Sequence, residues 1–139
     1  MLDLQSLKLV GSISPHVGNL SFLRNLILKN NSFNNEIPPE ISRLRKLQYL
    51  LLQNHMFSGK IPSSLSNCTN LDFLAAQNNL LTGEIPATLG PLLKLRFFSV
   101  YNNHLTGSIS PSFGNLSFLE GLAIDKNNLV GIIPILWAN

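Results

Sequence analysis

The sequence predicts a solenoid, in which coils of equal length stack around one continuous apolar core. The first observation is a period: the 139 residues, written in rows of 24, align from end to end without an insertion. Self-similarity at a period of roughly 20–50 residues is typical of repeat architectures. The second observation is composition, with 45% apolar and only 12% charged residues. A single coil cannot bury its own apolar edge, so neighbouring coils must cover it on both sides.

Each row contributes apolar residues at fixed positions, which we assign to the core. The columns that begin at Leu2, Leu4, Leu9 and Ile13 hold only leucine, isoleucine, valine, phenylalanine or alanine. Residues two apart face the same side of a strand, so each L-x-L pair predicts a short strand with one buried face. A further apolar column ends at Trp137.

Cys68 is the only cysteine, and it stands in a column of leucines. We therefore prefer a small buried hydrophobe to a reactive thiol at this position. A single cysteine cannot form a disulfide within the chain.

Polar residues also recur at the repeat spacing. A buried asparagine column predicts a ladder of amides that satisfies backbone groups where the chain leaves each strand. Leu7 and His55 depart from this column, so we expect the ladder to be interrupted at those coils. A glycine column predicts a tight bend, and a proline column predicts the end of a strand or the start of a helical turn. The asparagines are Asn31, Asn79, Asn103 and Asn127.

The pattern L-x-x-L-x-x-L-x-L-x-x-N-x-L-x-G-x-I-P resembles the plant-specific leucine-rich repeat. It is nearly complete in CTNLDFLAAQNNLLTGEIPATLG, where Cys68 and Ala76 replace two leucines. The resemblance implies an α/β solenoid, a right-handed superhelix of about five to six coils with a parallel concave sheet. It also implies a second short strand near G-x-I-P and 3₁₀ turns on the convex side. The coils are expected at about 1–19 (partial), 20–43, 44–67, 68–91, 92–115 and 116–139.

The segment LVGSISPHVGNLSFLRNL resembles the early repeats of plant receptor-like kinase ectodomains, and is most similar to the immune-receptor subfamily. No kinase motif is present, so we expect no enzymatic activity in this chain. The resemblance implies a fragment of a ligand-sensing domain on the extracellular face of the plasma membrane, with a peptide or protein ligand and a possible co-receptor. The family's cysteine-paired cap has no counterpart here, so we expect terminal caps to be absent and apolar edges to be exposed at both ends. The alternatives are a secreted inhibitor similar to polygalacturonase inhibitors, and a purely structural or assembly role.

The outward-facing strand positions are the candidate ligand site. Tyr49, Phe73, Phe97 and Tyr101 are predicted to form an aromatic band, and exposed aromatics are typical anchors of binding surfaces. The alternative is that the rings stack on one another and only cover the sheet. Gln53 and Gln77 are candidates in a neighbouring column.

Four N-x-S/T sequons make Asn19, Asn30, Asn67 and Asn115 candidate glycosylation sites. They favour a secreted or lumenal context, although asparagine-rich repeats also create sequons by chance. The chain opens without a signal peptide, so the sequence itself gives no targeting signal.

Other chemistry has little support in the sequence. The three histidines stand in different columns, and the basic residues behind the +3 charge are scattered. We therefore expect no metal or other cofactor and no nucleic-acid partner. The apolar runs are far shorter than the roughly 20 residues of a spanning helix, so we expect no membrane insertion by this segment.

Overall fold

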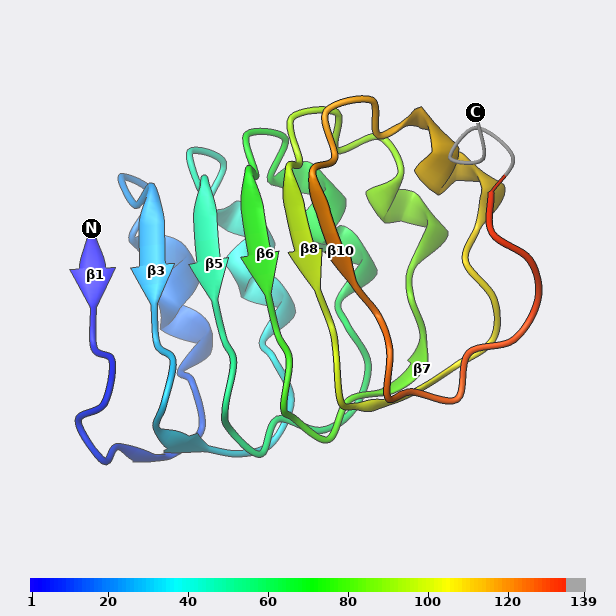
Figure 1. Cartoon of the computed structure of the whole chain (residues 1–139). Helices are drawn as coiled ribbons and strands as arrows, with labels where there is room; N and C mark the ends of the chain where they lie inside the picture. The colour runs from blue at the N-terminus through cyan, green and yellow to red at the C-terminus, as the bar shows by residue number, and fades with distance from the viewer. Residues whose placement is uncertain (135–139) are drawn as a thin grey trace.

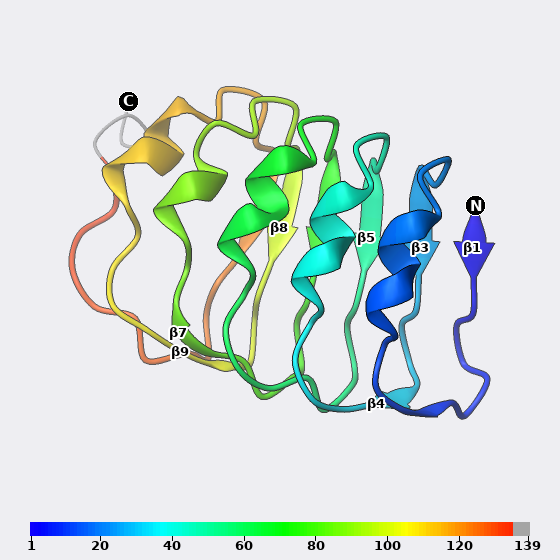
Figure 2. The same ribbon diagram turned by 180° about the vertical axis from the view of Figure 1, so that it is seen from behind.

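The structure, a computed structural model that describes residues 1–134, is a stack of short strands backed by a row of 3₁₀ helices (Figure 1, Figure 2). Six strands form one parallel sheet in the order β1-β3-β5-β6-β8-β10. Neighbouring strands are offset by one repeat, as in the pairing of Leu26 with Leu50 and of Leu50 with Leu74. The predicted solenoid fold is confirmed. The strands are β1 (Leu2–Asp3), β3 (Asn25–Ile27), β5 (Tyr49–Leu51), β6 (Phe73–Ala75), β8 (Phe97–Ser99) and β10 (Gly121–Ala123).

The core lies between the sheet and the 3₁₀ helices, where the apolar columns meet. Leu26 and Leu50 are completely buried, whereas their neighbours on the strands remain partly exposed. Cys68 is also fully buried, as predicted, and burial raises the pKa of its thiol to about 11. The predicted core position of Trp137 lies outside the described residues.

Each 3₁₀ helix begins where the sequence places proline or serine after the isoleucine column. Proline suits this position because its φ angle is fixed and it has no amide hydrogen to satisfy. Where serine replaces proline, the side chain caps the turn instead: the Ser14 hydroxyl accepts a hydrogen bond from the His16 amide at 3.2 Å. The helices are η1 (Pro15–Asn19), η2 (Pro39–Arg43), η3 (Ser63–Asn67), η4 (Ala87–Leu89) and η5 (Pro111–Asn115).

A second, shorter β strip runs beside the G-x-I-P segments, as the resemblance implied. It consists of two strand pairs joined by isolated bridges at Glu36–Ser58 and Lys60–Thr82. Gly107 has a φ of +76°, and a β-carbon there would lie 2.7 Å from the side chain of Glu84. Glycine is therefore needed both for the bend and for the close approach of the next coil. The paired strands are β2 (Val10–Gly11) with β4 (Ser32–Phe33) and β7 (Thr82–Glu84) with β9 (His104–Thr106).

The predicted asparagine ladder is present and links each coil to the one before it. The Asn79 side-chain oxygen accepts from the Phe57 amide at 3.1 Å. Its amide nitrogen donates to the carbonyls of Leu52 and Ala76, in the preceding coil and its own. Asn31, Asn103 and Asn127 repeat this arrangement.

The expected interruption of the ladder at His55 is wrong. The His55 Nδ1 accepts from the Phe33 amide at 3.2 Å, and Nε2 lies 2.6 Å from the Leu28 carbonyl. A neutral ring that carries its proton on Nε2 therefore makes both bonds between coils that an asparagine would make. Burial lowers the pKa of His55, and the hydrogen bond to Leu28 opposes this only in part, so the environment favours the neutral ring.

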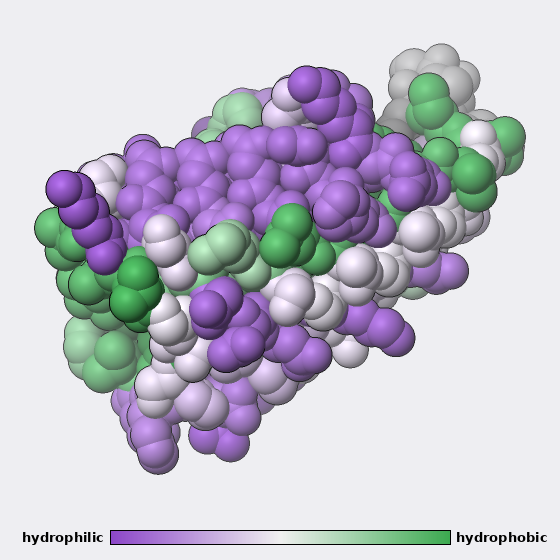
Figure 3. All heavy atoms as spheres, turned by 90° about the horizontal axis from the view of Figure 1, so that it is seen from below, coloured by the Kyte–Doolittle hydropathy of each residue, from purple (hydrophilic) through white to green (hydrophobic). Residues whose placement is uncertain are grey.

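Figure 3 shows apolar surface at both ends of the stack, with mainly hydrophilic surface between them on the face in view. Val10 and Ile132 are 76% and 78% exposed at opposite ends. The first coils also form an open apolar hollow of about 360 Å³, lined by residues that include Leu2 and Phe33. Within residues 1–134, part of the apolar core therefore faces solvent at the ends of the stack.

Candidate functional site

The most prominent feature of the sheet's outward side, which we call the open face, is a row of three rings. Tyr49, Phe73 and Phe97 hold the same register position on β5, β6 and β8. Their centroids are 6.1 Å and 5.0 Å apart, and all three side chains are half-buried. Tyr49 and Phe73 thus stack, and Phe97 packs at a tilt against Phe73, yet each ring keeps part of its surface open to solvent. We call these residues the ring row.

Both ends of the ring row are fixed by neighbouring residues. The Tyr49 side chain hydrogen-bonds the carboxylate of Asp72 in the next coil. At the other end, a β-carbon on Gly121 would lie 2.7 Å from the Phe97 ring, so the ring packs directly over the glycine backbone. The sequence analysis missed both of these contacts, because neither residue shows an aromatic or apolar signal of its own.

Tyr101, predicted to belong to the same band, makes different contacts. Its ring centroid lies 5.3 Å from the Lys126 ammonium, and the hydrogen bond that this ammonium donates to the Tyr101 side chain raises the pKa of Lys126. Among residues 1–134, Tyr101 forms no ring pair with Phe97. It therefore stands beside the ring row and is not one of its members.

Gln53 and Gln77 lie one coil apart on the open face, at the register position of Tyr101. Their side chains are half-buried, and the Oε1 atom of each is buried without a hydrogen-bond partner. A buried acceptor without a partner costs about 1–3 kcal/mol, so both atoms would gain from a donor.

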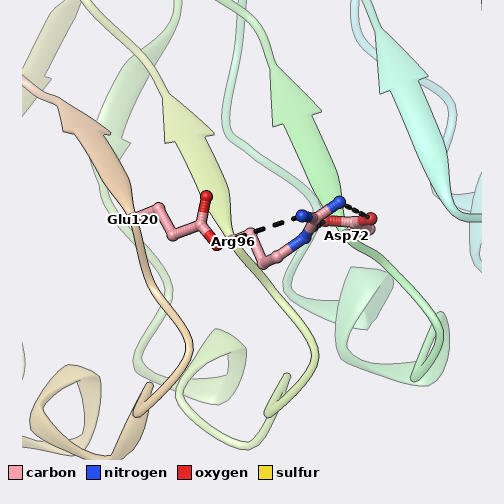
Figure 4. A network of polar contacts seen from close by, with 3 residues as sticks. All are labelled: Asp72, Arg96 and Glu120. Carbon is pink, nitrogen blue, oxygen red and sulfur yellow. Dashed lines mark hydrogen bonds and ion pairs between the residues drawn. The ribbon is translucent and has the colours of Figure 1, made fainter.

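A charge network borders the ring row, where β6, β8 and β10 begin (Figure 4). Arg96 donates two hydrogen bonds of 2.6 Å to Asp72, and its other nitrogen lies 3.9 Å from Glu120. The hydrogen bonds from Arg96 lower the pKa of Asp72 and raise that of Arg96 itself. The guanidinium also lies 5.9 Å from the Phe97 ring centroid. Opposite charges that recur at the repeat spacing were the signal that could have revealed this network.

The four sequon asparagines lie in two different settings. Asn19, Asn67 and Asn115 each end a 3₁₀ helix, on the side of the stack away from the sheet, and all are exposed. Asn30 is also exposed, but its side chain joins a second asparagine ladder that the sequence analysis did not identify.

This exposed ladder runs along the loop edge of the sheet. Asn54 donates to Asn30, Asn78 to Asn54 at 2.7 Å, and Asn102 to Asn78 at 3.0 Å. All four residues have a positive φ angle, which asparagine tolerates better than most residues.

A groove of about 820 Å³ runs along the second β strip. Glu36, Lys60 and Glu84 contribute alternating charges to its lining. Within residues 1–134, no group of three or more histidine, cysteine or acidic side chains could hold a metal ion. None of the helices described there is long and apolar enough to span a bilayer.

Comparison with known proteins identifies the repeats. The family profile described as Leucine Rich Repeat matches residues 22–44, 46–68 and 94–116. No curated protein sequence matches the chain. The Arabidopsis thaliana ectodomain of the receptor kinase GASSHO1/SCHENGEN3, in complex with CASPARIAN STRIP INTEGRITY FACTOR 2, is 39% identical with a TM-score of 0.93. This match covers 96% of the present chain and 16% of that chain.

Two further solved structures are similar over nearly the whole chain. The Arabidopsis receptor kinase HAESA, in complex with the peptide hormone IDA and the co-receptor SERK1, is 36% identical with a TM-score of 0.92. That match covers 96% of this chain and 22% of that chain. A plant ice-binding protein is 33% identical with a TM-score of 0.87, covering 98% of this chain and 44% of that one. The chain therefore spans less than a quarter of either receptor ectodomain.

Proposed function

Since the chain belongs to the leucine-rich repeat family, with repeats like those of plant receptor kinase ectodomains, we propose that it is a recognition module for a peptide or protein. It binds on the open face of the sheet by complementarity, without chemistry of its own. The ring row carries this proposal, because three half-exposed rings at strand spacing offer anchors to an extended ligand.

Gln53 and Gln77 belong to the same site, because both side chains are half-buried on the open face at the register position of Tyr101. Tyr101 and Lys126 would form the border of the site next to β8 and β10. Two solved relatives were crystallised with a partner, and for one of them the partners are a peptide hormone and a co-receptor. A co-receptor for this chain is part of the proposal, as is a place in the extracellular half of a receptor.

The test compares the protein with a variant in which Tyr49, Phe73 and Phe97 are replaced by alanine, using an array of extended synthetic peptides. We expect the array signals of the wild type to disappear in the variant. A matched control replaces Phe22 and Phe118, which are 64% and 65% exposed away from the ring row, and should keep the signals. Circular dichroism checks that both variants fold. Signals that survive the loss of the ring row would rule out this site.

The glycosylation sites are also part of the proposal. Asn19, Asn67 and Asn115 are exposed on the helix side, so glycans there would leave the open face free. Expression through a secretory pathway, followed by glycosidase treatment and peptide mass spectrometry, tests each asparagine separately. Unmodified asparagine at all three positions would contradict the assignment.

Ice binding is a second candidate, because one observation specifically favours it. The exposed ladder of Asn30, Asn54, Asn78 and Asn102 presents amides at the regular spacing of the coils. A regular row of donors and acceptors can match an ordered lattice of water, and a similar solved structure is a plant ice-binding protein. Thermal hysteresis that is lost on replacing Asn54 and Asn78 by glycine would support this function, and its absence in the wild type would exclude it.

A further inference from the structure

The charges on the open face are distributed unequally between its two ends. Two register columns flank the ring row, one just before the strands and one just after them. Arg24 and Lys29 occupy these columns beside β3, whereas Glu120 and Asp125 occupy the same columns beside β10. In each column the first charged residue is therefore a base and the last is an acid.

The coils between the two ends add almost no net charge. In the first column Asp72 and Arg96 neutralise each other through their paired hydrogen bonds. In the second column the intervening residues are Gln53, Gln77 and Tyr101, which carry no charge. The uncompensated charges thus lie at the ends of the ring row.

Nearby charges reduce this polarity without reversing it. Asp3 lies next to the basic end, where its carboxylate accepts from Gln5. Lys126 lies next to the acidic end, where its ammonium is engaged by Tyr101. One charge of the opposite sign stands near each pair, so a net charge of one unit remains at each end, positive beside β3 and negative beside β10. Among residues 1–134, neither Arg24 nor Lys29 has a carboxylate within ion-pair distance.

The length of this charge dipole sets the size of a matching ligand. Four strand steps separate β3 from β10, which at about 4.8 Å per step amounts to about 19 Å. An extended peptide advances about 3.3 Å per residue, so about six residues span this distance. The ring row lies between the two ends, on β5, β6 and β8.

We propose that the open face selects an extended peptide with an acidic group at one end, a basic group about six residues away and apolar side chains between them. The acidic group lies beside Arg24 and Lys29, the apolar residues on the ring row, and the basic group beside Glu120 and Asp125. This inference rests on the proposed function, because it assumes that the open face is the ligand site. Each exposed ion pair contributes little, so the charges act mainly as a filter on which peptides bind and in which orientation.

The test uses three fluorescent peptides of about eight residues with blocked ends and the same central leucine and phenylalanine residues. The bipolar peptide has two glutamates at one end and two lysines at the other. The mixed peptide has one of each at both ends, and the acidic peptide has two glutamates at both ends. Fluorescence anisotropy should give a Kd for the bipolar peptide roughly three- to tenfold lower than for the mixed peptide at low salt. High salt should remove this difference.

A charge-reversal variant, Glu120→Lys with Asp125→Lys, makes both ends of the open face basic. It should prefer the acidic peptide over the bipolar one, a gain that misfolding cannot produce. The matched control, Glu36→Lys with Glu84→Lys, changes the net charge equally on the second β strip, where Lys60 already fills the equivalent position. This control should keep the wild-type preference.

The outcomes separate this inference from the proposed function. Equal affinities of the wild type for the bipolar and mixed peptides would overturn the inference. If the ring-row alanine variant then lost both peptides, the proposed function would stand. If the control variant also came to prefer the acidic peptide over the bipolar one, the change in preference would come from net charge alone, and the inference would be overturned. Failure of every peptide to bind would also overturn it, and the peptide array would still judge the proposed function independently.

Discussion

Replacing Asn103 with alanine should destabilise the protein far more than replacing its exposed neighbour Asn102. Asn103 is only 5% exposed and belongs to the buried ladder. Its side-chain oxygen accepts from the Leu81 amide at 3.0 Å, and its nitrogen donates to the carbonyls of Ala76 and Val100, each at 3.0 Å. These three bonds, and a longer one of 3.4 Å to the Tyr101 carbonyl, disappear together in the variant.

The expected loss of stability depends on which hydrogen bonds each former partner of Asn103 still makes in the variant. The Ala76 carbonyl still receives Asn79, and the Val100 carbonyl still receives Asn127, so each loses one of two donors. Such a loss costs about 0.5 kcal/mol each, at the low end for a single hydrogen bond. The buried Leu81 amide is left without a partner, which costs about 1–3 kcal/mol. We therefore expect the free energy of unfolding to fall by about 3 kcal/mol.

The assay is urea unfolding followed by far-UV circular dichroism, with the urea dependence compared between variants to check cooperativity. The control is Asn102→Gly, which removes a bond of 3.0 Å in the exposed ladder and keeps a residue that tolerates the φ of +56°. Its stability should change by no more than about 0.5 kcal/mol. Equal losses in the two variants, or a loss below about 1 kcal/mol for Asn103→Ala, would refute the reasoning about the orphaned amide.

Three further predictions concern ionisation, reactivity and association. His55 has a lowered pKa in the folded state, so the unfolded chain binds the proton more readily; stability should be complete above about pH 6.5 and fall as the pH drops towards the folded value. Urea midpoints measured at neutral and acidic pH should show this dependence in the wild type and in His104→Asn but not in His55→Asn. If the midpoint of His55→Asn falls with pH as steeply as that of the wild type, the prediction is wrong. The Cys68 thiol, with a pKa of about 11 and no exposed surface, should react with a thiol reagent only in urea, so rapid labelling of the native protein would disprove its burial. The isolated chain should self-associate through its apolar ends, and Val10→Asp with Ile132→Asp should reduce this in light scattering, whereas a wild type that stays monomeric at high concentration would refute the prediction.

The fold was largely predictable because each structural position recurs in every repeat of the sequence. A leucine at one core position is weak evidence, but the same position one repeat later must fill the same place against the next coil. The strand register at Leu26, Leu50 and Leu74 follows directly from this spacing. His55 shows where the rule fails, because a different side chain reproduces the two hydrogen bonds between coils that an asparagine makes there.

The candidate site was predictable only in part, because the open-face positions vary from coil to coil. The sequence placed Tyr49, Phe73 and Phe97 in one column, and in the structure their rings pack in a row, Tyr49 stacked on Phe73 and Phe97 tilted against it. It also grouped Tyr101 with them, although that ring contacts Lys126.

The sequence by itself determined the period, the core and the strand register, because burial of apolar residues imposes the same demand on every coil. Only the tertiary structure decided which side chains of adjacent coils touch. The bond from Tyr49 to Asp72, the packing of Phe97 on Gly121 and the choice of Asp72 over Glu120 by Arg96 depend on rotamers and on distances across coils. Residues one repeat apart in sequence lie about 4.8 Å apart in space, where differences of an ångström decide whether a contact forms.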